Sequence, residues 1–310
     1  MTSLICGSLA YDTIMSFEGR FAEALLADQL HKINVAFLVP AMRREFGGCA
    51  GNIAYNLRLL GGDPLIMATV GQDSTPYLER LALQGITTRC IRGIDETWTA
   101  QAFITTDADS NQITAFHPGA MTFSHLNKVA DAGPLSIAIV APDGRDGMLQ
   151  HARDCVALEV PFIFDPGQGL PMFNGAELRD FIALATYVAV NDYEAELLTE
   201  RTGLSLAQIA TQVEALVVTR GENGAEIYVG GELLSIPPVP VEAIIDPTGC
   251  GDAFRAGLLY GLSNGLDWPT IGRLSSLMGS IKIGHQGGQN HAPTRTEIEE
   301  RFEAAFGYRF

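Results

Sequence analysis

The chain carries, at residues 246–257, the stretch Asp-Pro-Thr-Gly-Cys-Gly-Asp-Ala-Phe-Arg-Ala-Gly. The small residues Gly249, Cys250 and Gly251 allow a tight turn whose backbone N–H groups point into one concavity, which can bind an anion. Apolar residues at helical spacing follow from Ala253, so the turn is predicted to begin a helix whose positive dipole end faces the same place.

Asp252 lies at the edge of this predicted anion site. Phosphoryl transfer to a hydroxyl needs a group that accepts the proton and donors for the charge on the phosphoryl oxygens. The stretch therefore predicts that Asp252 is catalytic and that the backbone amides of Gly249, Cys250, Gly251 and Asp252 are the donors. The alternative is an aspartate that only caps the helix, since Asp is a preferred cap residue.

Composition limits the class of protein. The chain has 310 residues, 47% of them hydrophobic and 18% charged, which is enough for one large core. Its net charge of −16 argues against nucleic acid or an anionic membrane as a partner. The three lysines (Lys32, Lys128, Lys282) do not follow a glycine, so the sequence contains no Walker A motif.

The five cysteines include no Cys-x-x-Cys pair and are expected to be reduced thiols of a cytoplasmic protein. The six histidines show no metal-ligand spacing, and neither a membrane span nor an export signal is expected. Cys250 begins the predicted helix, where a thiol can have a lowered pKa, so it is predicted to oxidise readily.

Short apolar strands alternate with helical segments along most of the chain. Core strands are expected near residues 3–9, 65–70, 137–140, 162–164, 187–190 and 216–219, and helices near 51–60, 77–83, 148–158, 178–185 and 195–199. This alternation predicts an α/β fold with a doubly wound, mostly parallel sheet flanked by helices. The first strand is expected to end in a turn that delivers Asp12.

Two segments do not fit a doubly wound sheet. Residues 13–46 are irregular, and residues 100–116 alternate as a β-hairpin does. We expect one domain over residues 1–310, with a small β-rich lid formed by about residues 13–46 and 97–118.

A second glycine-rich stretch, Gly47-Gly48-Cys49-Ala50-Gly51-Asn52, resembles the N-terminal signature of the ribokinase-like carbohydrate kinases, the phosphofructokinase B family. The stretch 246–257 resembles their C-terminal signature. The resemblance covers nearly the whole chain and implies a ribokinase-like fold. It also implies an acceptor site formed by Asp12, Gly47, Gly48 and Asn52. Pro247 and Cys250 depart from the usual residues but leave the amide donors in place.

Smaller features imply a nucleotide site. Asn191-Asp192-Tyr193-Glu194 is similar to the family's Asn-x-x-Glu element, whose glutamate helps to hold Mg²⁺ through water, although Asn and Glu at this spacing also form a helix capping box. The turn at Thr219, Gly221 and Gly224 resembles the one that lies against ATP. The resemblance also implies nucleotide contact by Gly287 and a monovalent cation site, for K⁺, near Asp246 and residues 281–290.

The acceptor is expected to be a nucleoside, with adenosine first. A carboxylate such as Asp12 prefers vicinal hydroxyl pairs, which nucleosides present. The sequence around Asp12 and Gly47 also looks like that of bacterial nucleoside kinases in this family. Apolar contacts to a purine base are expected from Met42, Phe46, Phe103, Phe116 and Met121, unless these side chains only form the core of the lid.

Other functions stay open at this point. A fructose- or ribose-type sugar kinase is the first alternative, and a non-catalytic nucleoside or sugar sensor is the second. A Rossmann dehydrogenase is disfavoured, because no Gly-x-Gly-x-x-Gly follows the first strand. The family resemblance also makes a homodimer through the lid plausible.

Overall fold

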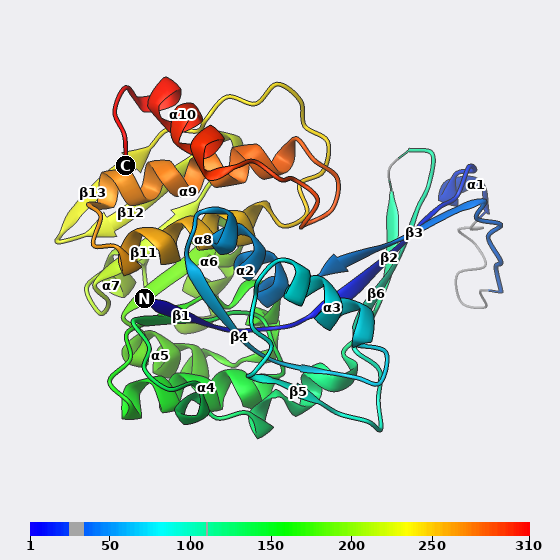
Figure 1. Cartoon of the computed structure of the whole chain (residues 1–310), viewed down its shortest axis with the longest axis horizontal. Coiled ribbons are helices and arrows are strands. Elements are labelled where there is room, and N and C mark those ends of the chain that lie inside the picture. The colour runs from blue at the N-terminus through cyan, green and yellow to red at the C-terminus, as the bar shows by residue number, and fades with distance from the viewer. Residues whose placement is uncertain (25–33, 110) are drawn as a thin grey trace.

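A nine-stranded sheet forms the centre of the protein, in a computed structural model that describes residues 1–24, 34–109 and 111–310. Figure 1 shows this sheet between two layers of helices. The strand order is β13 (Glu232–Ile236), β12 (Ala225–Val229), β11 (Ala215–Thr219), β10 (Tyr187–Asn191), β9 (Phe162–Phe164), β8 (Ile137–Val140), β1 (Thr2–Cys6), β4 (Asp63–Val70) and β5 (Ile91–Gly93). At one edge, β12 pairs antiparallel with both β11 and β13, and the other neighbouring strands pair parallel.

Helices cover both faces of this sheet because successive strand residues point to opposite sides. In β1, Ile5 belongs to a core cluster with α2, α3, α8 and α9, whereas Leu4 and Cys6 belong to a second cluster with α4 to α7. The helices are α1 (Phe21–Ala24), α2 (Cys49–Leu59), α3 (Thr75–Leu83), α4 (Arg145–Ala157), α5 (Gly175–Leu184), α6 (Asp192–Thr202), α7 (Leu206–Ala210), α8 (Cys250–Ser263), α9 (Trp268–Ile283) and α10 (Arg295–Phe306). The predicted doubly wound α/β fold is confirmed.

Short 3₁₀ segments connect several of these elements. They are η2 (Gly119–Leu126), η3 (Val129–Ala132), η4 (Gly167–Met172) and η5 (Gly221–Asn223). Helix α10 packs on α9 through a third cluster that includes Phe302 and Leu274. Among the described residues, no helix has the length and hydropathy that crossing a membrane requires.

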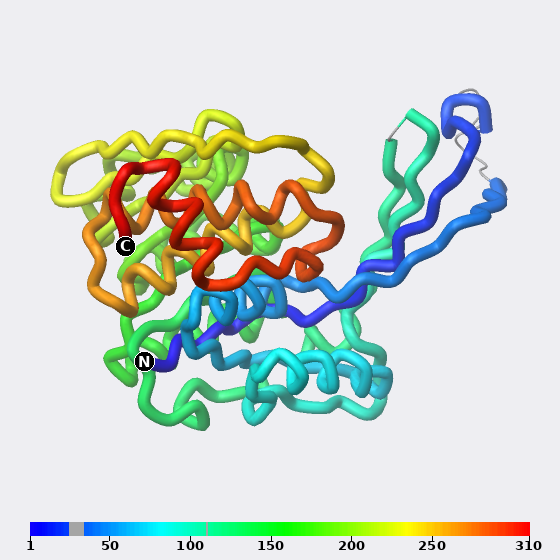
Figure 2. Tube along the Cα trace, turned by 45° about the horizontal axis from the view of Figure 1, so that its top comes forward, coloured from blue at the N-terminus to red at the C-terminus, as the bar shows by residue number. Residues whose placement is uncertain are grey.

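A second, four-stranded sheet projects from one end of the body, as Figure 2 shows. Its order is β3 (Ala41–Gly47), β2 (Ala10–Ser16), β6 (Ala100–Thr106) and β7 (Gln112–His117). Strands β6 and β7 form the predicted hairpin. Both lid segments expected from the sequence contribute strands to this sheet, and residues 25–33 and 110 of those segments lie outside the described residues.

The first strand and the segment after it differ from expectation. Strand β1 ends at Cys6 and not at Leu9, because the Ser8 amide turns to the carbonyl of Pro142 and the chain leaves the large sheet. The chain then enters β2, so Asp12 lies within a regular lid strand and not in a turn. Residues 13–16 and 41–46 were predicted to be irregular, which is wrong. They form regular strands, but most of their side chains stay partly or fully exposed, so no run of buried apolar residues marked them in the sequence.

Candidate active site

The first turn of α8 and the first turn of α2 meet at the carboxyl edge of the large sheet, which is where open α/β sheets bind their ligands. Asp252 and Asn52 join them: the Asn52 side-chain amide donates to Asp252 Oδ2 over 2.8 Å. These residues belong to the two glycine-rich stretches of the sequence, 200 positions apart. The structure therefore brings both stretches into one site.

Asp252 is half-buried in the first turn of α8. Burial raises the pKa of this carboxyl group to about 6, and the nearby Asp165 carboxylate acts in the same direction. The hydrogen bond from Asn52 and the charge of Arg255 oppose the shift. A carboxylate with such a pKa is ionised at neutral pH and is a stronger proton acceptor than an ordinary aspartate.

The turn before α8 presents backbone amides in the predicted manner at three of four positions. Gly249 has φ of 79°, a left-handed conformation that favours glycine, and it caps the helix. Within the described part of the chain, the amides of Gly249, Gly251 and Asp252 have no acceptor. The Cys250 amide, in contrast, donates to the carbonyl of Pro247 over 3.2 Å, so its assignment as a free donor is wrong.

Asp12 lies half-buried on β2, beside Gly47 at the end of β3. A side chain at Gly47 would overlap the Asp12 carboxylate, and one at Gly48 would overlap the backbone of residues 8–10. Burial, together with the carboxylates of Asp246 and Glu45, raises the pKa of Asp12 to about 6. Both glycines are therefore required by close approach of the backbone to the candidate acceptor site.

A buried hydrogen-bond chain connects this region to Asp252. The Gln289 side-chain amide donates to Asn52 Oδ1 over 3.1 Å and to the Tyr77 hydroxyl over 2.8 Å. The Tyr77 hydroxyl donates in turn to the Gly47 carbonyl over 2.7 Å. Sequence reasoning missed both Gln289 and Tyr77. A polar residue directly after Gly287-Gly288 was the available signal for the first, and Tyr77 gave none.

An ion-pair cluster lies one turn further along α8. The guanidinium of Arg255 is 3.0 Å from Asp165 Oδ1 and 3.9 Å from Glu194 Oε2, and the side chains of Arg255 and Asp165 are only 5% and 6% exposed. Asp165 directly follows β9, and Glu194 lies in the first turn after β10. No role for Arg255 or Asp165 was predicted from the sequence, although an arginine on an otherwise apolar helix face was a signal.

Residues predicted to bind the nucleotide lie along the same sheet edge. Asn191 and Thr219 are register partners at the ends of β10 and β11. Asn191 and Glu194 form a reciprocal capping box on α6, so the capping alternative is realised, and Glu194 also approaches Arg255. Gly221 and Gly224 form the turn after β11, both with positive φ. Among the described residues, no hydrogen bond joins Thr219, Gly221 or Gly224 to α8.

Gly287 lies on the other side of the anion site. Its amide donates to Asp246 Oδ2 over 2.8 Å, and the Thr248 amide donates to Asp246 Oδ1 over 2.9 Å. Although burial acts in the opposite direction, these hydrogen bonds hold the pKa of Asp246 below its ordinary value. The structure thus places Gly287 against the segment that leads into the anion site.

The predicted lowering of the Cys250 pKa is wrong. Burial raises the pKa of this thiol to about 11, the carboxylates of Asp246 and Asp252 act in the same direction, and the Lys282 charge opposes them. A thiol with this pKa is almost entirely protonated at neutral pH, and the thiolate is the reactive form. The structure therefore removes the basis for a readily oxidised Cys250.

The expected apolar base contacts are divided between the two faces of the lid. Register places Ala102, Ile104 and Phe116 on the face that carries Asp12. Met42, Phe46 and Phe103 lie on the opposite face with Tyr11. Assigning these three to the acceptor was therefore wrong, and Phe116 is the aromatic side chain of β6 and β7 that shares the face of Asp12. Met121 lies half-buried in η2, outside the sheet.

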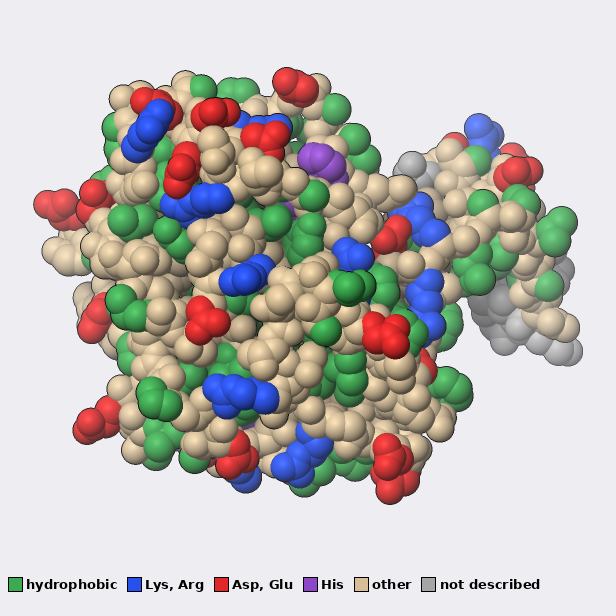
Figure 3. Space-filling view, in the orientation of Figure 1, with side chains coloured by type: hydrophobic (Ala, Val, Ile, Leu, Met, Phe, Trp, Pro, Cys, Tyr) green, Lys and Arg blue, Asp and Glu red, His purple; other side chains and the backbone are tan. Residues whose placement is uncertain are grey.

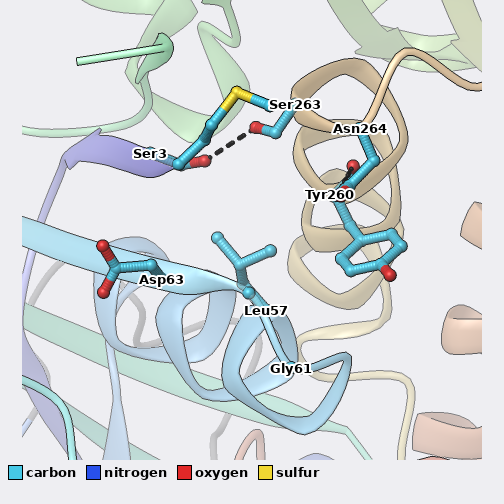
Figure 4. Close-up of a pocket in the computed structure, with 9 residues that line it drawn as sticks. Ser3, Leu57, Gly61, Asp63, Tyr260, Ser263 and Asn264 are labelled. Atoms are coloured by element: carbon cyan, nitrogen blue, oxygen red, sulfur yellow. Dashed lines mark hydrogen bonds between the residues drawn. The ribbon is translucent and has the colours of Figure 1, made fainter.

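A cavity of about 140 Å³ lies away from this site (Figure 4). Its lining includes Ser3 and Asp63, at the amino ends of β1 and β4, and Ser263 at the end of α8. Ligands of open α/β sheets bind at the carboxyl ends of the strands, so this cavity is not the candidate active site.

Known proteins resemble the whole chain. A family model described as pfkB family carbohydrate kinase matches residues 20–295. The nucleoside kinase of Methanocaldococcus jannaschii is 29% identical over 307 residues, which is 98% of this chain and 97% of that protein. The structure of Burkholderia thailandensis nucleoside kinase in complex with inosine is 59% identical, with a TM-score of 0.91 and coverage of 99% of both chains. Its complex with ADP-inosine is 60% identical, with a TM-score of 0.88 and coverage of 99% of this chain and 97% of that one.

These matches agree with the observed fold and with the predicted enzyme class. The family model covers most of the chain, including both glycine-rich stretches, and the solved structures share its fold end to end. The predicted enzyme class, an ATP-dependent phosphotransferase with an alcohol group as acceptor, is the class of this family. The chain therefore belongs to the pfkB family of carbohydrate kinases.

Proposed function

We propose that this protein is a nucleoside kinase that transfers the γ-phosphoryl group of ATP to the primary hydroxyl of a nucleoside, with Asp252 as the general base. The main support for the proposal is the hydrogen bond between Asn52 and Asp252. It joins the glycine-rich stretch 47–52, which is expected to bind the acceptor, to the anion site before α8. The relatives named above match over nearly the whole chain and are nucleoside kinases. The structure of one of them contains inosine.

In the proposed mechanism, Asp12 accepts hydrogen bonds from the sugar hydroxyls and the Asn52 side-chain amide donates to them. These hydrogen bonds orient the acceptor. Asp252 takes the proton from the primary hydroxyl as its oxygen attacks the γ-phosphorus in line. The amides of Gly249, Gly251 and Asp252 stabilise the charge on the phosphoryl oxygens. The lid covers the acceptor and excludes water, which would compete as a nucleophile.

The Arg255 cluster suits a divalent cation that arrives with the nucleotide. Two carboxylates, Asp165 and Glu194, face one guanidinium, which leaves an excess of negative charge. Mg²⁺ binds through one or two carboxylates, waters and substrate phosphates, so no cluster of three protein ligands is needed. Glu194 would hold Mg²⁺ through water, and the ion would neutralise charge on the phosphates. Asn191, Thr219, Gly221, Gly224 and Gly287 complete the proposed nucleotide site.

A substrate panel tests the proposal. Phosphate transfer from ATP with Mg²⁺ is measured for adenosine, inosine, guanosine, ribose and fructose, and we expect turnover of the nucleosides, adenosine included. Turnover of ribose or fructose alone would favour the sugar-kinase alternative. Tight binding of a nucleoside without any turnover would favour the sensor.

Phe116 is expected to contact the base. Phe116→Ala should lower kcat/KM for adenosine and inosine by about twofold to tenfold, because an aromatic pair contributes about 0.5–1.5 kcal/mol beyond the area that it buries. Phe103→Ala, which removes the same ring from the opposite face of the lid, is the matched control and should change kcat/KM little. The molecular mass of each variant is measured so that a change in assembly is detected. An equal loss in both variants would contradict the assignment.

The pH dependence follows from the two raised carboxyl pKa values. Asp252 must be ionised to accept a proton and Asp12 to accept hydrogen bonds, and both have a pKa of about 6. Activity is therefore present above pH 6 and lost below it, with the slope of log kcat/KM against pH approaching about 2. In Asp12→Asn the rate is lower and the slope approaches about 1, as expected for one titrating group. A profile that stays flat to pH 5 would contradict both roles.

We also propose a homodimer that forms through the lid, in a cytoplasmic protein. Met42, Phe103 and Ile113 expose apolar side chains on the lid face opposite Asp12, with exposed fractions of 68%, 40% and 44%. Elsewhere on the face shown in Figure 3, acidic and basic side chains are interspersed with apolar ones. Because burying exposed apolar surface is favourable, this face of the lid supports association of two subunits through it.

A further inference from the structure

The side chain of Lys282 is fully buried in the last turn of α9, behind the anion site. Its ammonium donates to the carbonyl oxygen of Asp246 over 2.6 Å and to that of His285 over 3.0 Å. These two oxygens come from segments that lie 39 positions apart in the sequence. A single positive charge thus holds together the chain before α8 and the loop after α9.

Asp246 extends this connection toward the anion site. Its carboxylate accepts from the Thr248 amide through one oxygen and from the Gly287 amide through the other. Its own amide donates to the carbonyl of Ile283 over 3.2 Å. Residues 246–248 are therefore fixed on one side by Lys282 and on the other by residue 287. Gly249, which begins the anion site, follows them directly.

The residues present do not fit the monovalent cation that the family resemblance implies for this place. K⁺ needs free oxygen atoms around it, such as the backbone carbonyl oxygens of a K⁺-channel filter. Here the Asp246 and His285 carbonyls already accept hydrogen bonds from an ammonium, which is a compact unit charge with three donors. Burial lowers the pKa of Lys282, and the nearby Cys250, Asp246 and Asp252 groups oppose this shift.

We propose that the Lys282 ammonium takes the place of the monovalent cation, as a positioning residue that sets the geometry of the anion site. The expected effect on turnover rests on the proposed function, whereas the hydrogen bonds of Lys282 to the Asp246 and His285 carbonyls do not. Because this charge is part of the chain, the anion site is fixed without any ion from solution. Phosphoryl transfer by this protein is then independent of K⁺.

The first test uses the wild-type protein in KCl and in choline chloride at equal concentration, with the nucleotide supplied as its choline salt. Turnover of adenosine should agree within about twofold, since ionic strength and hence screening are the same. The melting temperature of the protein without nucleotide should also be the same, because a bound ion would stabilise the folded state and none is bound. Saturable activation by K⁺ of about tenfold or more would overturn the proposal.

The second test removes the charge. Lys282→Ala should lose about 100-fold in turnover, because small displacements of a catalytic site have effects of that size. Methylammonium, ammonium or K⁺ should restore part of the loss and raise the melting temperature of this variant. Lys282→Met fills the space with an apolar chain and should not respond to any of these cations. Lys128→Ala is the matched control, because Lys128 also donates to a carbonyl, that of His125, but is exposed.

The outcomes are separable. A folded Lys282→Ala protein with wild-type turnover, or one that no cation rescues, would overturn the proposal. If this variant does not fold, the comparison of salts on the wild-type protein decides. If the wild-type protein phosphorylates no acceptor, the proposed function fails, and the melting temperatures of the wild-type and Lys282→Ala proteins in the two salts still test the role of Lys282.

Discussion

Asp252→Asn is expected to lower turnover of the nucleoside by about 10²- to 10⁴-fold, the range that a positioned proton acceptor contributes. The asparagine cannot take the proton of the attacking hydroxyl. Its side-chain oxygen can still accept the hydrogen bond that Asn52 donates to Asp252 in the wild-type protein. The fold and the acceptor site, including Asp12, should therefore be preserved, so the loss should appear in kcat with little change in nucleoside binding.

Steady-state turnover with MgATP and calorimetric titration of adenosine without nucleotide measure the two quantities separately. Asp180→Asn is the matched control, because Asp180 is an exposed carboxylate on α5, outside the site. It should behave as the wild-type protein does. If Asp252→Asn kept more than about a tenth of the wild-type turnover, Asp252 would not be the base, because such a loss is below the range of general-base catalysis.

Arg255→Met is expected to produce the largest loss of stability. The variant leaves the Asp165 carboxylate buried without its partner, 6% exposed, and breaking a buried pair in this way costs about 3–5 kcal/mol. Denaturant unfolding measures the loss directly. Arg309→Met, which breaks an exposed pair with Glu303, should leave the free energy of unfolding almost unchanged and is the matched control.

The double variant Asp165→Asn with Arg255→Met distinguishes an uncompensated charge from lost packing. Because neither charge is then left buried alone, we expect it to be more stable than Arg255→Met by about 1–3 kcal/mol. A double variant no more stable than Arg255→Met would show that packing, and not charge, explains the loss.

Arg255 also lowers the pKa of Asp252, so the acid limb of the pH profile in Arg255→Met should move to higher pH.

Local features of the sequence predicted the large sheet and the centre of the site. Each core strand is a short apolar run, and its alternate residues fill two separate clusters, as Leu4 and Ile5 do. The glycines around Asn52 and Asp252 mark close approaches of the backbone, which any chain of this fold must make. These requirements act over a few residues and are therefore visible without a structure.

Features that depend on topology were not predictable in this way. Asp165 and Arg255 are 90 positions apart, and they meet only because α8 packs against β8, which neighbours β9 in the sheet. The face on which Phe103 or Phe116 lies depends on strand register, which a shift of one residue would reverse. At Asn191 and Glu194 the same residue types satisfy both a capping box and a proposed ligand role, so the pattern could not distinguish the two.

The course of the chain from β1 into β2 divides the two important carboxylates between separate parts of the molecule. Asp12 is attached to the projecting sheet, and Asp252 is attached to the central one. Any rotation of one sheet against the other therefore changes the separation of these two groups, while each keeps its own neighbours. The alignment of a hydroxyl with a phosphate thus depends on the angle between two sheets, and residues 7–9, which connect these sheets and lie against Gly48, are one of the links that set this angle.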